Sequence, residues 1–242
     1  MRLLATTFVY NEIRYIDQWV KWYRSNGCEL FVLDNMSNDG TYEWLVKNNI
    51  PCARVDTKGS FHLHALQDEL MKHLERIKPD WVVYNGADLF TITDKRLIDT
   101  ITELDQNGYN QLQLPCYNMF KTGEMDGTPL QLHFVRGGRY RNLIMTAKYE
   151  DGFNIRNDNL GLTNQNPKRV KGIMVNYGGC KPAKEQEEKL KRRQKAWDNG
   201  LPRNVGKHFK AGKSINWIYK KEGTIDLSEG ETWKYIKKIQ CL

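Results

Sequence analysis

The sequence predicts an α/β fold in which helices cover both faces of a mainly parallel β-sheet. Over residues 1–115, short apolar runs typical of strands alternate with segments of helical periodicity, and the connections between them are short. Hydrophobic residues make up 40% and charged residues 27% of the 242-residue chain, as in ordinary globular proteins. No stretch approaches the roughly 18–20 continuous apolar residues that a membrane span needs.

Each element of this half has its own signal. Strands are predicted where a short run is continuously apolar, and helices where apolar residues recur every three or four positions. Asn, Gly and Pro mark the helix ends. The predicted elements are a strand at 3–9, a helix with Ile13, Ile16, Val20 and Tyr23 ended by Asn26-Gly27, a strand at 30–33, a helix from Asp39 or Gly40 to Asn48-Asn49, a strand at 52–55, a helix with Leu63, Leu66, Leu70, Leu74 and Ile77, and a strand at 81–84.

The pattern is weaker in the middle of the chain and becomes helical again at its end. Residues 117–166 are rich in glycine and contain short strand-like pieces, which we interpret as loops folded onto the sheet. A last helix near residues 228–239 is expected to dock through Trp233, Ile236 and Ile239.

Positive charge is concentrated toward the carboxyl terminus. The net charge is +8, and residues 168–221 alone hold 16 Lys and Arg against four acidic residues. Here residues 183–197 predict a basic helix whose apolar positions, Ala183, Leu190 and Trp197, form a narrow stripe that can pack. This distribution indicates a surface for a polyanion such as nucleic acid, a nucleotide or anionic lipid. The alternative is a lysine-rich surface that keeps the protein in solution.

Cysteine usage bears on the compartment. The five cysteines are far apart, odd in number and contain no CxxC pair, so a disulfide framework or a zinc site is not expected. Residues 1–10 lead into Asn11-Glu12 without a small-residue cleavage site, which favours a buried strand over a signal peptide. We therefore expect a soluble, cytoplasmic protein.

Polar residues follow three of the predicted strands. Because ligands of parallel sheets bind beyond the carboxyl ends of the strands, these turns predict the site. An Asp before a helix commonly caps it, and Asp39 has this simpler interpretation. The candidates are Tyr10, Asn11 and Glu12 after the first strand, Asp34 after the second, and Asp88 after the fourth.

The order and spacing of these turns resemble a known family. Tyr-Asn-Glu at 10–12, followed by a helix, a strand and Asp-Asn-x-Ser-x-Asp-Gly-Thr at 34–41, is similar to the inverting nucleotide-sugar glycosyltransferases of family 2. The resemblance covers about the first 105 residues. It implies a single GT-A domain over 1–242 with a Rossmann-like half. Its parts would be a nucleotide-sugar-binding half at 1–115, an acceptor-side half at 116–182 and a basic helical C-terminal region at 183–242.

The resemblance implies a role for each candidate. Tyr10, Asn11 and Glu12 would line the nucleotide pocket, and Asp34 would accept a hydrogen bond from the base, typically uracil. Asp88 would match the last Asp of an Asp-x-Asp motif that holds a divalent cation, Mn²⁺ or Mg²⁺, and the donor diphosphate. Such a cation neutralises charge on the leaving diphosphate.

The resemblance also implies a general base for the acceptor hydroxyl. An inverting transferase takes the hydroxyl proton with a carboxylate. In the segment 148–152, Asp151 and then Glu150 resemble the family's Glu-Asp pair. Asp126 and Asp158 are further candidates, and an ordinary surface pair is the alternative.

Two departures from the family pattern affect the metal. Gly86 stands in place of the first Asp of Asp-x-Asp, and Asn176 stands where relatives often carry the His of a His-Tyr-Gly segment. His208 is the candidate replacement ligand, although it would equally suit a solvated basic loop. Without a metal, basic residues would stabilise the leaving diphosphate, for example Lys207, Lys210 and Lys213.

The sequence thus predicts a transferase that moves a hexosyl or pentosyl group from a nucleotide-sugar, first of all a UDP-sugar, to an acceptor hydroxyl with inversion. The acceptor would be hydroxymethylated bases in phage DNA, bound through residues 168–221, or a surface polysaccharide or lipid-linked glycan. A non-catalytic nucleic-acid-binding protein on the same fold is the alternative of a different class. A nucleotidyltransferase would carry a glycine-rich phosphate loop after the first strand, which residues 10–12 do not form.

Overall fold

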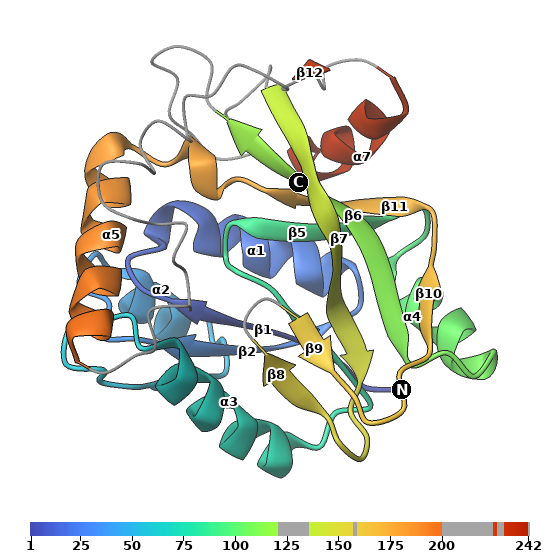
Figure 1. The fold of residues 1–242 in the computed structure, drawn as a ribbon, viewed down its shortest axis with the longest axis horizontal. Coiled ribbons are helices and arrows are strands. Elements are labelled where there is room, and N and C mark those ends of the chain that lie inside the picture. The colour runs from blue at the N-terminus through green and yellow to red at the C-terminus, as the bar shows by residue number, and fades with distance from the viewer. Residues whose placement is uncertain (121–135, 157–158, 200–224, 227–229, 242) are drawn as a thin grey trace.

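The computed structural model describes residues 1–120, 136–156, 159–199, 225–226 and 230–241, and shows a curled sheet flanked by helices (Figure 1). The predicted α/β fold class is confirmed. The elements are β1 (Leu3–Val9), α1 (Ile13–Ser25), β2 (Glu29–Asp34), α2 (Thr41–Lys47), β3 (Cys52–Arg54), α3 (Leu63–Ile77), β4 (Trp81–Tyr84), β5 (Leu89–Thr93), α4 (Leu97–Gln106), β6 (Gln111–Phe120), β7 (Arg136–Lys148), β8 (Asn154–Arg156), β9 (Asn159–Gly161), β10 (Pro167–Arg169), β11 (Gly172–Asn176), the 3-10 turn η1 (Gly178–Cys180), α5 (Ala183–Asp198), β12 (Ile225–Asp226) and α7 (Gly230–Gln240).

The main sheet is parallel in its first half and mixed in its second. Its strand order is β3-β2-β1-β4-β7-β6-β11-β5, and β10 and β12 add to β6 and β7. The first four strands of this order are parallel, as predicted. β7 is antiparallel to both β4 and β6, and β5 is antiparallel to β11. The antiparallel pairs thus come mainly from the part of the chain in which the sequence pattern is weak.

The strand directions define two edges of the sheet. β1, β2 and β4 run the same way, so Val9, Asp34 and Tyr84 end at one edge, called the carboxyl edge below. The opposite, amino edge holds their first residues. β7 runs the other way and ends there, because Lys148 pairs with Trp81. With a rise of about 3.3 Å per residue, the seven residues of β1 separate the two edges by about 20 Å.

The apolar stripes of α1 and α3 are buried as predicted, with two exceptions. Ile13, at the start of α1, is 41% exposed, because it lies at the carboxyl edge before the helix meets the sheet. Ile77, the last residue of α3, is only partly buried. Burying each such aliphatic side chain contributes roughly 1.5–3 kcal/mol before entropy costs. The buried residues of the two stripes are Ile16, Val20 and Tyr23 of α1 and Leu63, Leu66, Leu70 and Leu74 of α3.

The docking of α5 differs from the prediction. Leu190 and Trp197 are only partly buried, and among the described side chains of α5 the fully buried one is that of Ala196. The side chain of Ala183 lies outside the described residues. The prediction assumed an apolar partner surface, whereas α5 lies along the flank of the carboxyl edge (Figure 1), beside polar turns and aromatic rings.

α7 docks through two of its three predicted anchors. Ile236 and Ile239 are fully buried, and the side chain of Trp233 lies outside the described residues. The Tyr235 hydroxyl donates a hydrogen bond to Asp94 Oδ1 at 2.8 Å, which ties α7 to the end of β5.

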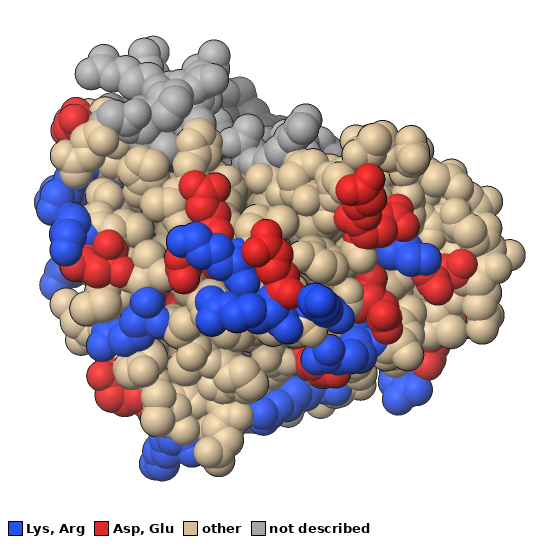
Figure 2. All heavy atoms as spheres, turned by 90° about the horizontal axis from the view of Figure 1, so that it is seen from below, with Lys and Arg blue, Asp and Glu red and all other residues tan. Residues whose placement is uncertain are grey.

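Two global features bear on partners. No helix in the described part of the chain is both long and apolar enough to cross a membrane. On the face shown in Figure 2, Lys and Arg alternate with Asp and Glu, so this face has mixed charge and no continuous basic surface.

Two glycines allow a steric test of the fold. Gly27, after α1, has φ +82°, and an added Cβ would lie 2.6 Å from Cγ2 of Ile98. Gly108, after α4, has φ +75° and open space at that position among the described residues. We predict that Gly27→Ala lowers the free energy of unfolding by about 2–4 kcal/mol, because overlap adds to the strain of roughly 1–2 kcal/mol that Gly108→Ala incurs alone. Urea denaturation measures both, and equal losses would show that Ile98 moves aside without cost.

Candidate functional site at the carboxyl edge

The turns after β1 and β2 form one hydrogen-bonded unit. Asn11 has a left-handed backbone, with φ +55°, and its N–H donates to Ser37 Oγ at 3.0 Å. Its side chain makes two hydrogen bonds of 2.9 Å with Asn38, donating one and accepting one. The Glu12 N–H donates to Thr41 Oγ1 at 2.9 Å. The two predicted motifs therefore hold each other in place.

Asp39 caps two helices at once. Its Oδ1 accepts from the Thr41 N–H at 3.0 Å, in the first turn of α2. Its Oδ2 accepts from the Ile13 N–H at 3.1 Å, at the start of α1. The capping role expected of Asp39 is thus confirmed and extends to α1, whose free N–H groups it helps to satisfy.

Asp34 is fully buried and engaged by its own neighbours. Its Oδ2 accepts from Arg54 Nε at 3.0 Å and from the Ser37 N–H at 3.1 Å. Arg54 in turn lies over Tyr42, with its guanidinium carbon 4.3 Å from the ring centroid. The Arg54 side chain is 33% exposed, so Arg54 and Tyr42 form the outer surface of this turn while Asp34 lies beneath.

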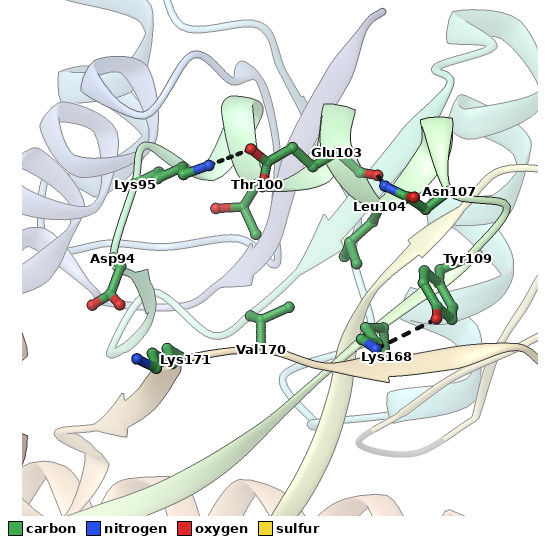
Figure 3. A pocket seen from close by; sticks show the side chains of 10 residues that line it. All are labelled: Asp94, Lys95, Thr100, Glu103, Leu104, Asn107, Tyr109, Lys168, Val170 and Lys171. Atoms are coloured by element: carbon green, nitrogen blue, oxygen red, sulfur yellow. Dashed lines mark hydrogen bonds and ion pairs between the residues drawn. The ribbon is translucent and has the colours of Figure 1, made fainter.

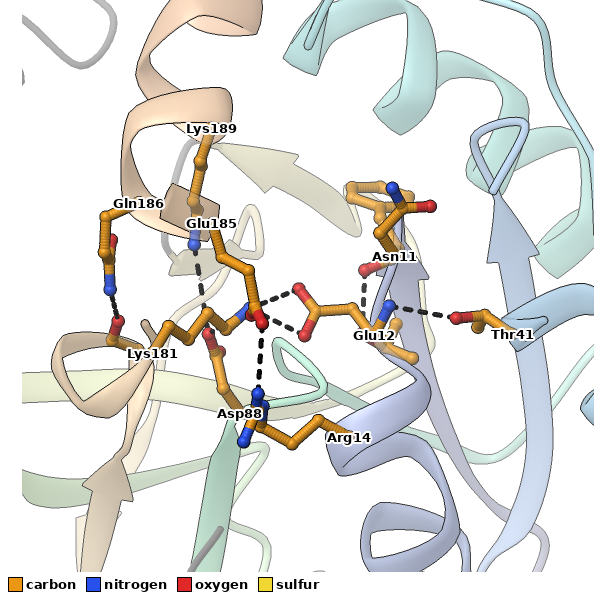
Figure 4. Close-up of polar contacts among 12 residues, drawn as sticks. Asn11, Glu12, Arg14, Thr41, Asp88, Lys181, Glu185, Gln186 and Lys189 are labelled. Carbon is orange, nitrogen blue, oxygen red and sulfur yellow. Dashed lines mark hydrogen bonds and ion pairs between the residues drawn. The ribbon is translucent and has the colours of Figure 1, made fainter. Parts of the chain in front are cut away.

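Lys181 joins the turns after β1 and β4 (Figure 4). Its Nζ is 2.5 and 2.6 Å from the two carboxylate oxygens of Glu12 and 3.3 Å from Asp88 Oδ2. Lys189 of α5 adds a second ammonium, 3.8 Å from the same oxygen of Asp88. We call these four residues the carboxylate–lysine cluster. The Lys181 side chain is 5% exposed and that of Lys189 35%, so Lys189 is the member that reaches solvent.

The charges of the cluster stabilise one another. Burial alone would raise the pKa of Asp88, but the ammonium groups of Lys181 and Lys189 lower it to about 2. Burial opposes the charged form of Lys181, and the carboxylates of Glu12 and Asp88 nevertheless raise its pKa. Burial and the neighbouring Lys181 lower the pKa of Lys189 to about 8. Asp88 is therefore ionised at neutral pH, with Lys181 as its buried counter-ion.

Glycines on two segments make room for Asp88. An added Cβ at Gly86 would lie 2.7 Å from Asp88 Oδ1, and one at Gly178 would lie 3.0 Å from Oδ2. The Tyr177 N–H donates to the Asp88 carbonyl at 2.8 Å, and Asn176 Oδ1 accepts from the Gly178 N–H at 2.9 Å. A side chain at position 86, such as an Asp, would therefore require the Asp88 carboxylate to shift.

The donor set at Asp88 does not fit a divalent cation. A cation bound to Asp88 Oδ2 would share that oxygen with ammonium groups at 3.3 and 3.8 Å. Unit charges 4 Å apart repel by about 4 kcal/mol near a protein surface, and a divalent ion doubles that figure. Among the residues that the structure describes, no group of three or more His, Cys, Asp or Glu is arranged to bind a metal. Six predicted candidates lie outside the described residues, namely Asp126, Asp158, Lys207, His208, Lys210 and Lys213.

Two arginines extend the cationic face of α5. Arg192 and Arg193 lie one helical turn beyond Lys189. The guanidinium carbon of Arg192 is 3.1 Å from the ring centroid of Tyr10, and that of Arg193 is 5.3 Å from the centroid of Phe61. The excess of basic residues predicts that these arginines face outward, on a surface for a polyanion. Their spacing of three and four residues from Lys189 is the sequence signal that they share its face.

Glu150 and Asp151 do not lie at the carboxyl edge. They follow the end of β7 at the amino edge, where the Tyr149 N–H donates to the Asp80 carbonyl at 2.8 Å. Glu150 Oε1 accepts from Asn110 Nδ2 at 2.8 Å, and Asp151 is exposed in a turn. The predicted base is therefore separated from the other candidates by the length of the strands, because β7 is antiparallel to β4.

A hollow of about 440 Å³ also lies at the amino edge (Figure 3). It is bounded by the end of β5, by α4 and by β10, and charges of both signs line it, among them Asp94, Lys95, Lys168 and Lys171. It contains none of the predicted site residues.

The fold and the cluster together define an α/β protein with a polar, charged site beyond the carboxyl ends of parallel strands, where such sheets bind their ligands. No protein-family model matches the chain, and no curated protein matches it. Similarity is found to solved structures.

Three of these solved structures show the degree of similarity. TarS 1-349 from S. aureus, in complex with UDP, is 18% identical with a TM-score of 0.38, covering 53% of this chain and 38% of that chain. Glucosyl-3-phosphoglycerate synthase from Mycobacterium tuberculosis, in complex with phosphoglyceric acid, is 15% identical with a TM-score of 0.42, covering 76% and 74%. A197 from STIV is 14% identical with a TM-score of 0.27, covering 52% and 50%. The chain spans less than half of the TarS chain, and at these TM-scores the function has to be argued from the residues of the site.

The cluster predicts a large stability effect at Lys181. Lys181→Met leaves the Glu12 and Asp88 carboxylates without their buried counter-ion, and we expect it to lower the free energy of unfolding by about 3–5 kcal/mol. Lys72→Met on α3 removes an exposed ion pair with Glu69 and should cost less than about 1 kcal/mol. Urea denaturation at neutral pH measures both. Similar losses in the two variants would contradict the buried ion pairs.

The low pKa of Asp88 predicts a dependence on pH. Its folded-state pKa of about 2 lies below the ordinary value of 3.8, so the ionised carboxylate stabilises the fold above that value and loses this contribution as the pH falls toward 2. The stability difference between the wild type and Asp88→Asn should therefore shrink from about pH 5 to about pH 2. Urea denaturation across this range tests it, and a difference that stays constant would rule out the depressed pKa.

Proposed function

We propose that the protein is a glycosyltransferase that binds a nucleotide-sugar at the carboxyl edge and transfers the sugar to an acceptor hydroxyl. The observation that carries this proposal is that the turns after β1, β2 and β4, with residues 10–12, Asp34 and Asp88, lie at one edge beside the cations of α5. These turns are the same ones that resemble the family 2 glycosyltransferases, and the resemblance supports inversion and a UDP-sugar donor.

The geometry suggests how the donor would lie. The turn after β2 presents Arg54 stacked on Tyr42, a planar cationic surface next to which a nucleobase can bind, with Asp34 holding Arg54 from beneath. The diphosphate would lie toward α5, where Lys189 carries positive charge at the surface of the cluster. In the reaction the bond between the anomeric carbon and the diphosphate oxygen breaks. The acceptor oxygen bonds to that carbon, its proton passes to a base, and the diphosphate leaves with the electron pair.

Neither Glu150 nor Asp151 is proposed as that base, because both lie at the amino edge. Residues 116–182 contain the rest of the sheet and would supply the acceptor side of the domain.

A polyanionic acceptor is the finer part of the proposal. The carboxyl-terminal stretch 168–221 has a large excess of Lys and Arg. Its described residues include exposed Lys184 and Lys195 on α5 and Lys168 on β10. These support DNA with hydroxymethylated bases as the acceptor, and DNA binding would weaken steeply with salt because counterions are released. An enzyme that acts on a lipid-linked glycan at a membrane would instead need added apolar surface.

The test is release of nucleoside diphosphate from UDP-, GDP- and CDP-sugars, with hydroxymethylated DNA, plain DNA and glycans as acceptors. We predict turnover with one donor, and a loss of at least about 100-fold in Asp88→Ala, because Asp88 keeps the cations beside the leaving group in position. Asp99→Ala, which removes an exposed aspartate of α4, is the matched control and should keep full turnover.

Two results would contradict the proposal. Full turnover in Asp88→Ala would remove the donor site from this edge. Binding of DNA without binding or turnover of any nucleotide-sugar would favour the non-catalytic nucleic-acid-binding alternative.

A further inference from the structure

We propose that Lys189 and Arg192 of α5 bind the diphosphate of the donor directly, in the place where a divalent cation would serve, while Lys181 holds Glu12 and Asp88 in position. This inference rests on the proposed function, because it concerns the same ligand and the same edge of the sheet. It goes beyond it by assigning the cationic part of the site to side chains of this chain.

The charge count at the edge supports a dianionic ligand. Lys181, Lys189 and Arg192 carry three positive charges, and Arg193 on the same face adds a fourth. Asp88 supplies one negative charge, and Glu12, whose pKa burial raises, supplies a second when it is ionised. The edge therefore keeps an excess of at least two positive charges, which matches a diphosphate group and leaves a divalent cation repelled.

Lys181 is unsuited to contact the ligand itself. Its Nζ lies within 3.3 Å of three carboxylate oxygens, and its side chain is 5% exposed. An ammonium has three hydrogens to donate, and the carboxylates of Glu12 and Asp88 use them. Lys181 is thus a positioning residue, which neutralises the two carboxylates and fixes the distance between the β1 turn and α5.

Lys189 and Arg192 have the donors that Lys181 lacks. The Lys189 Nζ is 3.8 Å from Asp88 Oδ2, beyond hydrogen-bond distance, and 35% of its side chain reaches solvent. In Arg192, the Nη2 donates to the Ser60 carbonyl at 3.2 Å, while its Nε is buried without a hydrogen-bond partner in the described part of the chain. A buried guanidinium N–H without a partner is costly, and a phosphate oxygen would satisfy it.

The two side chains are arranged to act on one group. They are three residues apart on α5, so they lie on the same face within one helical turn of about 5.4 Å. Tyr10 lies under Arg192, and this stacking fixes the guanidinium plane beside the end of β1. As the glycosidic bond breaks, the diphosphate oxygen keeps the bonding electron pair. The two cations then stabilise the added charge without a proton transfer or a metal.

The experiment is calorimetric titration of UDP, GDP, CDP and inorganic diphosphate into the full-length protein, once in EDTA and once with Mn²⁺. We expect a nucleoside diphosphate to bind in EDTA with an affinity that Mn²⁺ leaves within about twofold. Lys189→Gln should weaken binding about tenfold or more, because it removes a charge-assisted contact.

Lys191→Gln is the matched control. It makes the same charge change on the same helix, two residues away, at a side chain that is 72% exposed and paired with Glu187 at 3.0 Å. It should change the affinity by less than about twofold. Thermal melting of both variants checks that each is folded, which the exposure of both side chains favours.

The outcomes separate this inference from the proposed function. Nucleoside diphosphate binding that requires Mn²⁺ and is the same in Lys189→Gln and the wild type would overturn the role of the lysine and leave the glycosyltransferase proposal standing. The absence of binding for every nucleotide, with or without Mn²⁺, would overturn both. Inorganic diphosphate that binds as a nucleoside diphosphate does, and is weakened by the same substitution, would locate the contact at the diphosphate.

Discussion

The buried ammonium of Lys181 is the interaction on which the architecture of the site depends. It lies between the carboxylates of Glu12 and Asp88, which come from turns far apart in the chain. Removing two carboxylates from water costs several kcal/mol each unless an opposite charge compensates them. Because Lys181 lies two residues before the start of α5, the same contact fixes where that helix begins. The positions of Lys189 and Arg192 over the carboxyl edge follow from this one ion cluster.

Arginine–tyrosine stacking gives the edge a second level of order. Arg54 covers Tyr42 beside the β2 turn, and Arg192 covers Tyr10 beside the β1 turn. Stacking of this kind keeps the guanidinium charge intact while burying one of its apolar faces, and hydrogen bonds to Asp34 and to the Ser60 carbonyl hold the two groups in place. The aromatic residues near the site thus orient the two arginines, and a planar guanidinium group lies beside each of the β1 and β2 turns.

What could be predicted from the sequence depended on how local each signal was. The strands and helices of the amino-terminal half, the helix end at Gly27 and the anchors Ile236 and Ile239 follow from periodicity and turn residues over a few positions. The inward face of α5 could not be predicted in this way. Its lysines face inward because they pair with Glu12 and Asp88, and the sequence does not show that these two residues are adjacent. The sequence likewise does not predict at which edge Glu150 lies. Its position depends on the direction of β7, and strand direction has no local sequence signature.

The glycine at position 86 has a consequence for how substitutions at the site combine. A single change to Asp would overlap the carboxylate of Asp88 and would place a third acid beside Glu12, with no added cation. An acid at position 86 could share a cation with Asp88 only together with the loss of positive charge at Lys181 or Lys189. Each step alone would be unfavourable, so the substitutions are coupled. The energetic effect of a change at position 86 therefore depends on which residues stand at positions 181 and 189, so that the three positions form one epistatic unit.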